Sequence, residues 1–208
     1  MLHSLFQRNY SLLLAGFMLF IITAGFSYKS SIVPEEPELC LSKEEQRLYD
    51  LIIAYRKQKR LPSIKISAAL TKVAQIHARD LSMNKPNNTN DCNMHSWSSK
   101  GSWTPCCYDS QHAQALCMWS KPKEIAGFQA DGFEIVYGSM KESFIATPDA
   151  ALAAWQKSPG HHAVIINSDT WKQRTWKAIG LGVYKNYICV WVASVEDKNT
   201  IEKKCNGE

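Results

Sequence analysis

The sequence predicts an α+β domain in which a small antiparallel sheet lies between helices. Two stretches near the start of the domain carry apolar residues with the period of an α-helix. Two stretches near its end are rich in β-branched and aromatic residues and have a polar pair between them. Helices at both ends of such a sheet give an α+β or a layered α/β/α domain. A chain of 208 residues suits one such domain with a leader in front of it.

Residues 42–55 predict the first helix. Ser42 and Glu45 have the spacing of a capping box, in which each side chain bonds the other residue's backbone amide. Apolar residues then recur at intervals of three and four up to Tyr55. Ser67 begins the second helix, and its apolar face is predicted to hold Leu70, Val73, Ala74, His77 and Leu81.

The rest of the domain alternates between loop and regular structure. Residues 91–122 predict a long ordered loop with one helical turn near residues 110–116, and loops of this length are usually functional or cross-linked. Residues 133–137 fit a short strand or a turn of helix. Pro148 suits the first position of a helix over residues 148–157.

The last elements are a helix stop and a hairpin. Ser158-Pro159-Gly160 is expected to end the third helix. Residues 178–183 and 187–194 predict two antiparallel strands, with Lys185-Asn186 as the turn between them.

The N-terminus predicts export. Residues 1–27 have a weakly basic start and an apolar run over residues 10–26, which fits a secretory signal peptide or a membrane anchor. A linker over residues 28–42, a domain over residues 43–196 and a polar C-terminal tail over residues 197–208 follow. With either kind of leader, the domain is expected to be extracellular, periplasmic or at the cell surface.

Cysteine usage agrees with that compartment. The chain has seven cysteines, so at least one is free or pairs between chains. Four of them lie between residues 91 and 118, which predicts a loop held by disulfides. The competing interpretation is a structural zinc site that includes His112. Cys106 and Cys107 are adjacent in sequence, and we expect each to have a different partner.

Composition argues against several functions. The formal net charge is +5, and the basic residues are scattered, so no nucleic-acid partner is expected. The short basic run over residues 56–60 is interpreted as a solvated helix end. The chain also lacks the nucleophile-elbow, phosphate-loop, dinucleotide and His-Glu-x-x-His signatures.

The histidines are the remaining candidates for chemistry. His95 lies in the cysteine-rich region, and His161 and His162 directly follow Ser158-Pro159-Gly160, where a site is commonly built. Glu134 is acidic between apolar neighbours, and a buried carboxylate needs a partner. His77 is interpreted as a core histidine, because it lies on the apolar stripe of the second helix.

The order of several motifs resembles the CAP superfamily of cysteine-rich secretory, antigen 5 and pathogenesis-related proteins, and especially its bacterial SCP-like members. Residues 70–81 resemble the family's helix with the pattern Leu-x-x-x-Ala-x-x-His-Ala-x-Asp-Leu. Residues 133–135 take the place of its Gly-Glu-Asn motif, and residues 155–161 are similar to the bacterial Trp-x-x-Ser-Pro-Gly-His motif. The resemblance covers about residues 44–195.

This resemblance implies a CAP-type α–β–α sandwich with a small antiparallel sheet between helices and a central cleft. By analogy, His95 and His161 would hold zinc or another divalent metal, with His162 as the alternative to His161, and Glu134 would be the first acidic residue of the cleft. Glu134 would orient a histidine or water, or act as a general base. The family's second glutamate is missing, since residues 149–157 offer Trp155 and Gln156 instead.

Three functions remain open at this point. One is an extracellular module that binds a metal and an unknown lipid, glycan or peptide, with the aromatic residues of the cysteine-rich loop either contacting that ligand or forming core. The alternative is a metal-assisted extracellular hydrolase with Glu134 as its general base. In the third, His95, His161 and Glu134 are purely structural and bind no metal.

Overall fold

The computed structural model of the chain describes residues 39–89, 91–201 and 204–205. The leader predicted for residues 1–27 and most of the linker predicted for residues 28–42 lie outside the described residues. The helices are α1 (Lys43–Gln58), α2 (Ala68–Asn84), α3 (Ala115–Trp119), α4 (Lys121–Ala126), α5 (Pro148–Lys157), α6 (Pro159–Ile166) and the short 3-10 helix η1 (Asp169–Trp171). The strands are β1 (Lys65–Ile66), β2 (Phe133–Gly138), β3 (Ala178–Tyr184) and β4 (Tyr187–Ala193).

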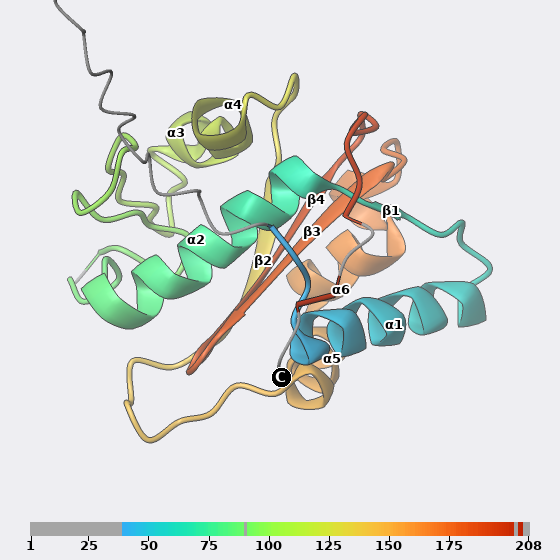
Figure 1. Cartoon of the computed structure of the whole chain (residues 1–208), viewed down its shortest axis with the longest axis horizontal. Coiled ribbons are helices and arrows are strands. Elements are labelled where there is room, and N and C mark those ends of the chain that lie inside the picture. Colours follow the sequence, from blue (N-terminus) through green and yellow to red (C-terminus); the bar gives the residue numbers. More distant parts are fainter. Residues whose placement is uncertain (1–38, 90, 202–203, 206–208) are drawn as a thin grey trace, which may run out of the picture. The chain divides into compact units, whose positions relative to one another are not determined.

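The described strands form a four-stranded sheet in the order β1-β3-β4-β2. The predicted hairpin is β3 and β4, and β2 pairs antiparallel with β4. The two-residue β1 adds a parallel edge to β3, so the sheet is mixed. Helices α2, α3 and α4 lie on one face of the sheet, and α1, α5 and α6 lie on the other (Figure 1). The predicted α–β–α sandwich is therefore confirmed.

Both faces of the sheet are buried, and the side chains alternate between them. Along β4, Ile188, Val190 and Val192 pack toward α1, α5 and α6. The intervening Cys189 and Trp191 pack toward α2. Successive residues of a strand point to opposite faces, so an unbroken apolar run is what a sheet covered on both sides requires.

Glycines in β3 let α2 approach the sheet closely. A Cβ atom on Gly180 would lie 2.1 Å from the backbone carbon of Leu70, and one on Gly182 would lie 2.2 Å from that of Ala74. The two contacts are about one helical turn apart on α2, which matches two residues of extended strand. Helix α2 therefore rests on strand backbone, and His77 follows Ala74 along the same helix.

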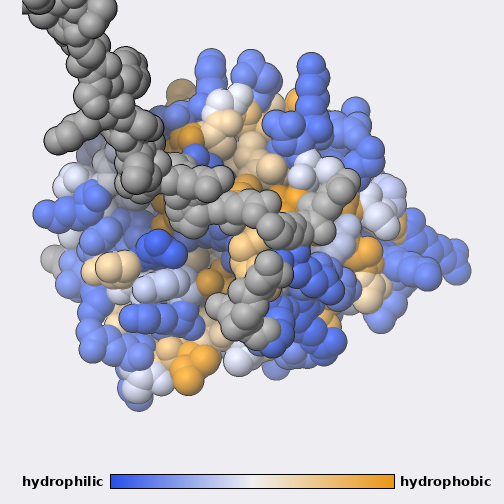
Figure 2. Space-filling model, viewed as in Figure 1, coloured by the Kyte–Doolittle hydropathy of each residue, from blue (hydrophilic) through white to orange (hydrophobic). Residues whose placement is uncertain are grey.

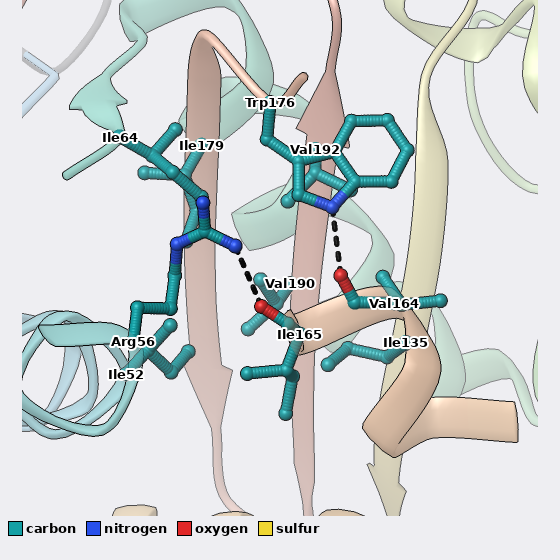
Figure 3. Close-up of a pocket in the computed structure, with 10 residues that line it drawn as sticks. All are labelled: Ile52, Arg56, Ile64, Ile135, Val164, Ile165, Trp176, Ile179, Val190 and Val192. Carbon is teal, nitrogen blue, oxygen red and sulfur yellow. Dashed lines mark hydrogen bonds between the residues drawn. The ribbon is translucent and has the colours of Figure 1, made fainter. Parts of the chain in front are cut away.

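Helix α1 carries the predicted capping box of Ser42 and Glu45. Its other end is tied to α6 by Arg56, which is 1% exposed. In the pocket of Figure 3, the Nη1 group of Arg56 donates to the carbonyl oxygen of Ile165, at 2.6 Å. Burial lowers the pKa of Arg56 to about 10. The interpretation of residues 56–60 as a solvated face is therefore wrong for Arg56.

Two helix positions differ from the sequence prediction. The helical turn expected near residues 110–116 begins only at Ala115, and α4 follows directly after α3. The stop expected at residues 158–160 is instead a junction, because Ser158 ends α5 and also precedes α6. Pro159 occupies the first turn of α6, where a missing backbone N–H costs nothing.

The two ends of the described chain are joined. A disulfide links Cys40 to Cys205, and a second one links Cys92 to Cys107. Within the predicted tail, the carboxylate of Asp197 accepts hydrogen bonds from the backbone N–H of Ala69 and from the Ser67 hydroxyl, at the start of α2. The tail is thus attached to the domain by covalent and polar contacts.

The surface is mainly hydrophilic in the view of Figure 2, with apolar residues in small separate patches. No helix in the described part of the chain is long and apolar enough to cross a membrane. The apolar run over residues 10–26 lies outside that part.

Candidate functional site

Glu134 is the centre of the candidate site. It lies on β2 opposite Trp191 of β4, and its side chain is fully buried on the α2 face of the sheet. His77 Nδ1 donates to its Oε1 atom at 2.6 Å, and His95 Nδ1 donates to its Oε2 atom at 2.9 Å. One carboxylate therefore binds a histidine from helix α2 and a histidine from the cysteine-rich loop.

The second ring nitrogen of His77 fixes its protonation state. Nε2 lies 3.0 Å from the carbonyl oxygen of Ser96, which can only accept a hydrogen bond. With Glu134 ionised on the other side, both nitrogens of His77 donate, and the ring is an imidazolium. The indole ring of Trp97 stacks on it, with ring centroids 4.1 Å apart and an interplanar angle of 6°. This stacking favours the cationic form of the ring.

The charges of this pair support each other. Burial alone would raise the pKa of Glu134, but the charge of His77 and hydrogen bonds from His77 and His95 hold it below its ordinary value. Burial alone would lower the pKa of His77, but the charge and hydrogen bond of Glu134 raise it above its ordinary value. Each partner therefore favours the charged form of the other, as expected for a buried imidazolium–carboxylate pair.

His95 is oriented by its surroundings. Because Nδ1 donates to Glu134, Nε2 is the ring nitrogen of His95 that remains for another partner. The ring of Tyr108 packs edge-on against it, with centroids 5.3 Å apart. The backbone N–H of His95 donates to Asn93 Oδ1 at 2.9 Å, which holds the loop. The side chain is 20% exposed, so the ring borders solvent on one side.

His161 lies in the first turn of α6 and close to His95. Burial lowers its pKa, and the nearby His95 lowers it further, so the ring is neutral at pH 7. Its Nδ1 is 2.8 Å from the hydroxyl oxygen of Ser158. When Nδ1 donates there, Nε2 keeps its lone pair. The neighbouring His162 is instead hydrogen-bonded through Nε2 to the hydroxyl of Tyr55, at 2.9 Å.

The structure joins His95 to Glu134 and brings His161 near His95. His77 is a core histidine as predicted, but it is also part of this network, which the sequence did not predict. A signal was present, because a buried imidazole on an apolar helix face needs partners for both nitrogens. Trp155 lies in the segment where the resemblance would place a second glutamate. It is buried, and its indole N–H donates to the carbonyl oxygen of Val136.

The donor set fits a divalent metal at the two outer histidines. Among the described residues, Nε2 of His95 and Nε2 of His161 have no hydrogen-bond partner, and both rings are held through Nδ1. Two neutral imidazoles suit zinc and leave positions for water or another ligand. Glu134 has both oxygens occupied by histidine N–H groups, and one of these hydrogen bonds holds the ring of His95.

A second group of potential ligands lies deeper. Ligand atoms of His77, Glu134 and Cys189 are all within 4.8 Å of one another. Both nitrogens of His77 carry protons, however, and burial and then the charge of Glu134 raise the pKa of the Cys189 thiol well above its ordinary value. A metal would have to displace several protons here, so we interpret this group as a buried charge cluster.

The aromatic residues of the cysteine-rich loop lie mainly in the core and not on the surface of the candidate site. Trp97 and Tyr108 are buried in the core on the α2 side, which favours a packing role for these aromatic rings over direct ligand contact. His112 is hydrogen-bonded to the Tyr108 hydroxyl at 2.7 Å. In the described chain it joins no group of three potential metal ligands, so the structural zinc alternative gains no support.

Comparison with known proteins identifies the family. Residues 49–190 match the family described as CAP, the cysteine-rich secretory protein family, and the chain therefore belongs to it. No curated protein matches the sequence.

Three solved bacterial structures are similar to the fold. An extracellular protein containing an SCP domain from Bacillus anthracis is 21% identical with a TM-score of 0.49, and the match covers 73% of this chain and 40% of that one. An outer surface protein from Borrelia burgdorferi is 19% identical with a TM-score of 0.46, and the match covers 72% of this chain and 92% of that one. A cysteine-rich secretory protein from Staphylococcus aureus is 14% identical with a TM-score of 0.47, and the match covers 78% of this chain and 41% of that one. The chain thus spans about two-fifths of the Bacillus protein.

Proposed function

We propose that this chain is a secreted or surface CAP-domain protein that binds a divalent metal, zinc or another, through His95 and His161. We further propose that the cleft holds a small extracellular ligand, a lipid, glycan or peptide, beside the metal. The observation that carries the proposal is the hydrogen bond from His95 Nδ1 to the buried Glu134, because it holds the ring through one nitrogen and leaves Nε2 for a metal, with His161 nearby.

The energetics of the site support binding. Each of the two rings is held by a partner, Glu134 for His95 and Ser158 for His161. A ligand that is already oriented loses less conformational freedom when the metal binds. Carboxylate partners of metal-bound histidines also raise the basicity of the ring. A bound metal would supply a Lewis acid that attracts an oxygen or nitrogen donor of the ligand.

The disulfides support an exported protein. Disulfides persist in oxidising compartments and are rare in the cytosol. Cys40–Cys205 and Cys92–Cys107 both lie in the domain that follows the leader proposed for residues 1–27.

Hydrolysis with Glu134 as general base is less well supported. An efficient base has a pKa near the working pH and reaches the proton it removes. The pKa of Glu134 is held below its ordinary value, although burial opposes this, and both its oxygens accept hydrogen bonds from histidines. Binding is therefore the function that these contacts favour.

The test is a calorimetric titration of the exported, oxidised chain with zinc. We expect one equivalent to bind with micromolar or tighter affinity, and we expect His95→Ala and His161→Ala to abolish this binding. The matched control is His162→Ala, which removes an adjacent imidazole that bonds Tyr55 and should leave zinc binding intact.

Glu134→Gln sharpens the test. Because Glu134 orients His95, the substitution should weaken zinc by roughly 10–100-fold without changing the stoichiometry. Binding that is absent in the wild type, or unchanged in both His95→Ala and His161→Ala, would rule out the metal site. The histidines and Glu134 would then be a structural network.

A further inference from the structure

The cysteine-rich loop contains two sulfurs without a disulfide. Cys92 and Cys107 are bonded to each other, whereas Cys106 and Cys117 carry free thiols. Cys106 is buried and Cys117 is partly exposed. Cys189, the remaining free thiol, is buried beneath α2.

The backbone around Cys106 is fixed against the helix that carries Cys117. The Cys117 sulfur lies 3.9 Å from the carbonyl oxygens of Thr104 and Pro105, the two residues that directly precede Cys106. On the other side of Cys106, the backbone N–H of Cys107 donates to Gln114 Oε1 at 2.9 Å, just before α3 begins. Segment and helix therefore meet on both sides of Cys106.

Helix α4 holds the same segment in place. Lys121 Nζ donates to the carbonyl oxygen of Thr104 at 2.6 Å, and the Thr104 hydroxyl donates to the Glu124 carboxylate at 2.7 Å. Lys121 is fully buried. These buried and charged contacts hold residues 104–107 against α3 and α4.

The two thiols interact directly. Burial raises the pKa of the Cys106 thiol to about 12, and contact with the Cys117 side chain adds to that shift. The contacts of Thr104, Pro105 and Cys107 with residues 114–117 place the two sulfur groups near each other, so a small movement can bring them to bonding distance.

We propose that Cys106 and Cys117 form a third disulfide bond when the chain is exported. Two S–H bonds break and one S–S bond forms. The S–S bond of an oxidant also breaks, and both electrons and both protons pass to that oxidant, either glutathione disulfide or the cysteine pair of a thiol oxidoreductase, which leaves as two thiols. Cys189 is then the one cysteine of the seven that stays a thiol.

The partly exposed Cys117 provides the route for the reaction. It first attacks the oxidant to form a mixed disulfide, and Cys106 then displaces the oxidant's thiol. Because burial suppresses the Cys106 thiolate in the folded protein, closure is expected mainly during folding, before Cys106 is covered.

Cys106 and Cys107 are adjacent in an extended segment, and this explains why each has a different partner. Cys106 forms an isolated antiparallel bridge with Trp97, so this segment is locally extended. Successive side chains of an extended segment point in opposite directions. Cys107 therefore reaches Cys92, while Cys106 faces Cys117.

The new bond would also stiffen the wall of the candidate site. Trp97 and Cys106 exchange both backbone hydrogen bonds, at 2.8 and 3.1 Å, and Trp97 stacks on His77. The proposal nevertheless does not rest on metal binding, and its test involves no metal.

The experiment maps cysteines in the full chain after export to an oxidising compartment. The protein is denatured without reductant, alkylated with iodoacetamide, digested and analysed by mass spectrometry. We expect one alkylated cysteine, Cys189. In the Cys92→Ser/Cys107→Ser variant we expect the same single alkylation, together with a linked peptide pair that contains Cys106 and Cys117.

Cys117→Ser provides the matched control, because it should expose Cys106 and give two alkylated positions. The proposal is overturned if Cys106 and Cys117 are both alkylated in wild-type protein that has been refolded with glutathione disulfide. It is equally overturned if Cys106 is found linked to Cys92. Alkylation of both cysteines in the wild type would count against the proposal even if a variant fails to fold.

Discussion

The two faces of the sheet are buried by different means. On the face toward α1, α5 and α6, branched aliphatic and indole side chains fill the space, and the buried charge of Arg56 is met by neutral oxygens of Pro62, Ile165 and Asn167. On the face toward α2, the strand presents glycines where the helix touches it, and charged His77 and Glu134 lie beyond the contact.

The difference shows that a buried polar site needs a closer contact between helix and sheet than an apolar core does. Where ordinary side chains fill the contact, they keep the axis of a helix about 10 Å from the element it packs against. Glycine at positions 180 and 182 brings α2 onto the strand backbone. His77 then reaches Glu134 directly, and the pair is isolated from solvent under α2.

The largest effect is expected at Gly180. In Gly180→Ala, the new Cβ would lie 2.1 Å from the backbone carbon of Leu70 and 2.3 Å from its oxygen, so α2 must shift as a whole. We expect the free energy of unfolding to fall by about 3 kcal/mol. Urea denaturation followed by far-UV circular dichroism measures the loss.

The control for this prediction is Gly160→Ala in α6, where a Cβ meets nothing within 4 Å. It should change the free energy of unfolding by less than about 1 kcal/mol. Equal losses at the two glycines would mean that close contact with α2 is not what Gly180 provides.

A smaller effect is expected on the opposite face, at Arg56. Arg56→Met keeps the apolar stem but leaves the carbonyl oxygens of Pro62 and Ile165 without their buried donor. The expected loss is about 2 kcal/mol in the free energy of unfolding. Arg47→Met is the control, because Arg47 pairs with Asp149 in solvent and its removal should have no measurable effect. Similar losses of unfolding free energy in both variants would contradict the conclusion that the buried hydrogen bonds of Arg56 stabilise the fold.

The third prediction concerns pH. The raised pKa of His77 stabilises the fold below its unfolded pKa of 6.5, and this contribution is lost as pH rises through the folded value. The lowered pKa of Glu134 stabilises the fold above its unfolded pKa of 4.5, and this contribution is lost as pH falls through the folded value. The pair therefore contributes most between these two unfolded values.

Glu134→Gln should reverse the pH slope around neutrality. Without the carboxylate, burial disfavours the imidazolium of His77, so stability should rise with pH through 6.5, whereas in the wild type it should fall above that pH. At pH 6 we expect a loss of about 1–2 kcal/mol. Urea midpoints from pH 5 to 8 provide the measurement.

Glu45→Gln is the control for the pH prediction. Burial raises the pKa of Glu45, so its contribution is present below its unfolded pKa and is lost as pH rises through the folded value. The control should therefore alter the acid end of the profile and leave the slope above pH 6.5 unchanged. Parallel profiles for Glu134→Gln and the wild type would contradict the buried ion pair.

The sequence predicted the regular elements well, because their signals are local. The capping box of Ser42 and Glu45 and the helix start at Ser67 were correct, as were the helix at Pro148 and the hairpin turn at Lys185-Asn186. The junction at Ser158 was misjudged because a proline that cannot continue one helix is well suited to begin the next.

The site was predictable only in part. His95, Glu134 and His161 were proposed from a resemblance, since nothing in the spacing connects residues so far apart in the chain. The role of His77 depends on which strand lies beneath α2, and that is decided by contacts such as Gly182 against Ala74. The burial of Arg56 was likewise hidden, because its partners Ile165 and Asn167 come more than a hundred residues later.

The bond between Cys40 and Cys205 turns the described domain into a covalent ring, with the two Cα atoms 5.0 Å apart. A protease that cuts one loop between these residues opens the ring but releases no fragment. The two pieces stay attached through the sulfurs and can keep their packing across the sheet. A nick of this kind is visible on a gel only after reduction, so an apparently intact band is no proof of an uncut chain in an environment rich in proteases.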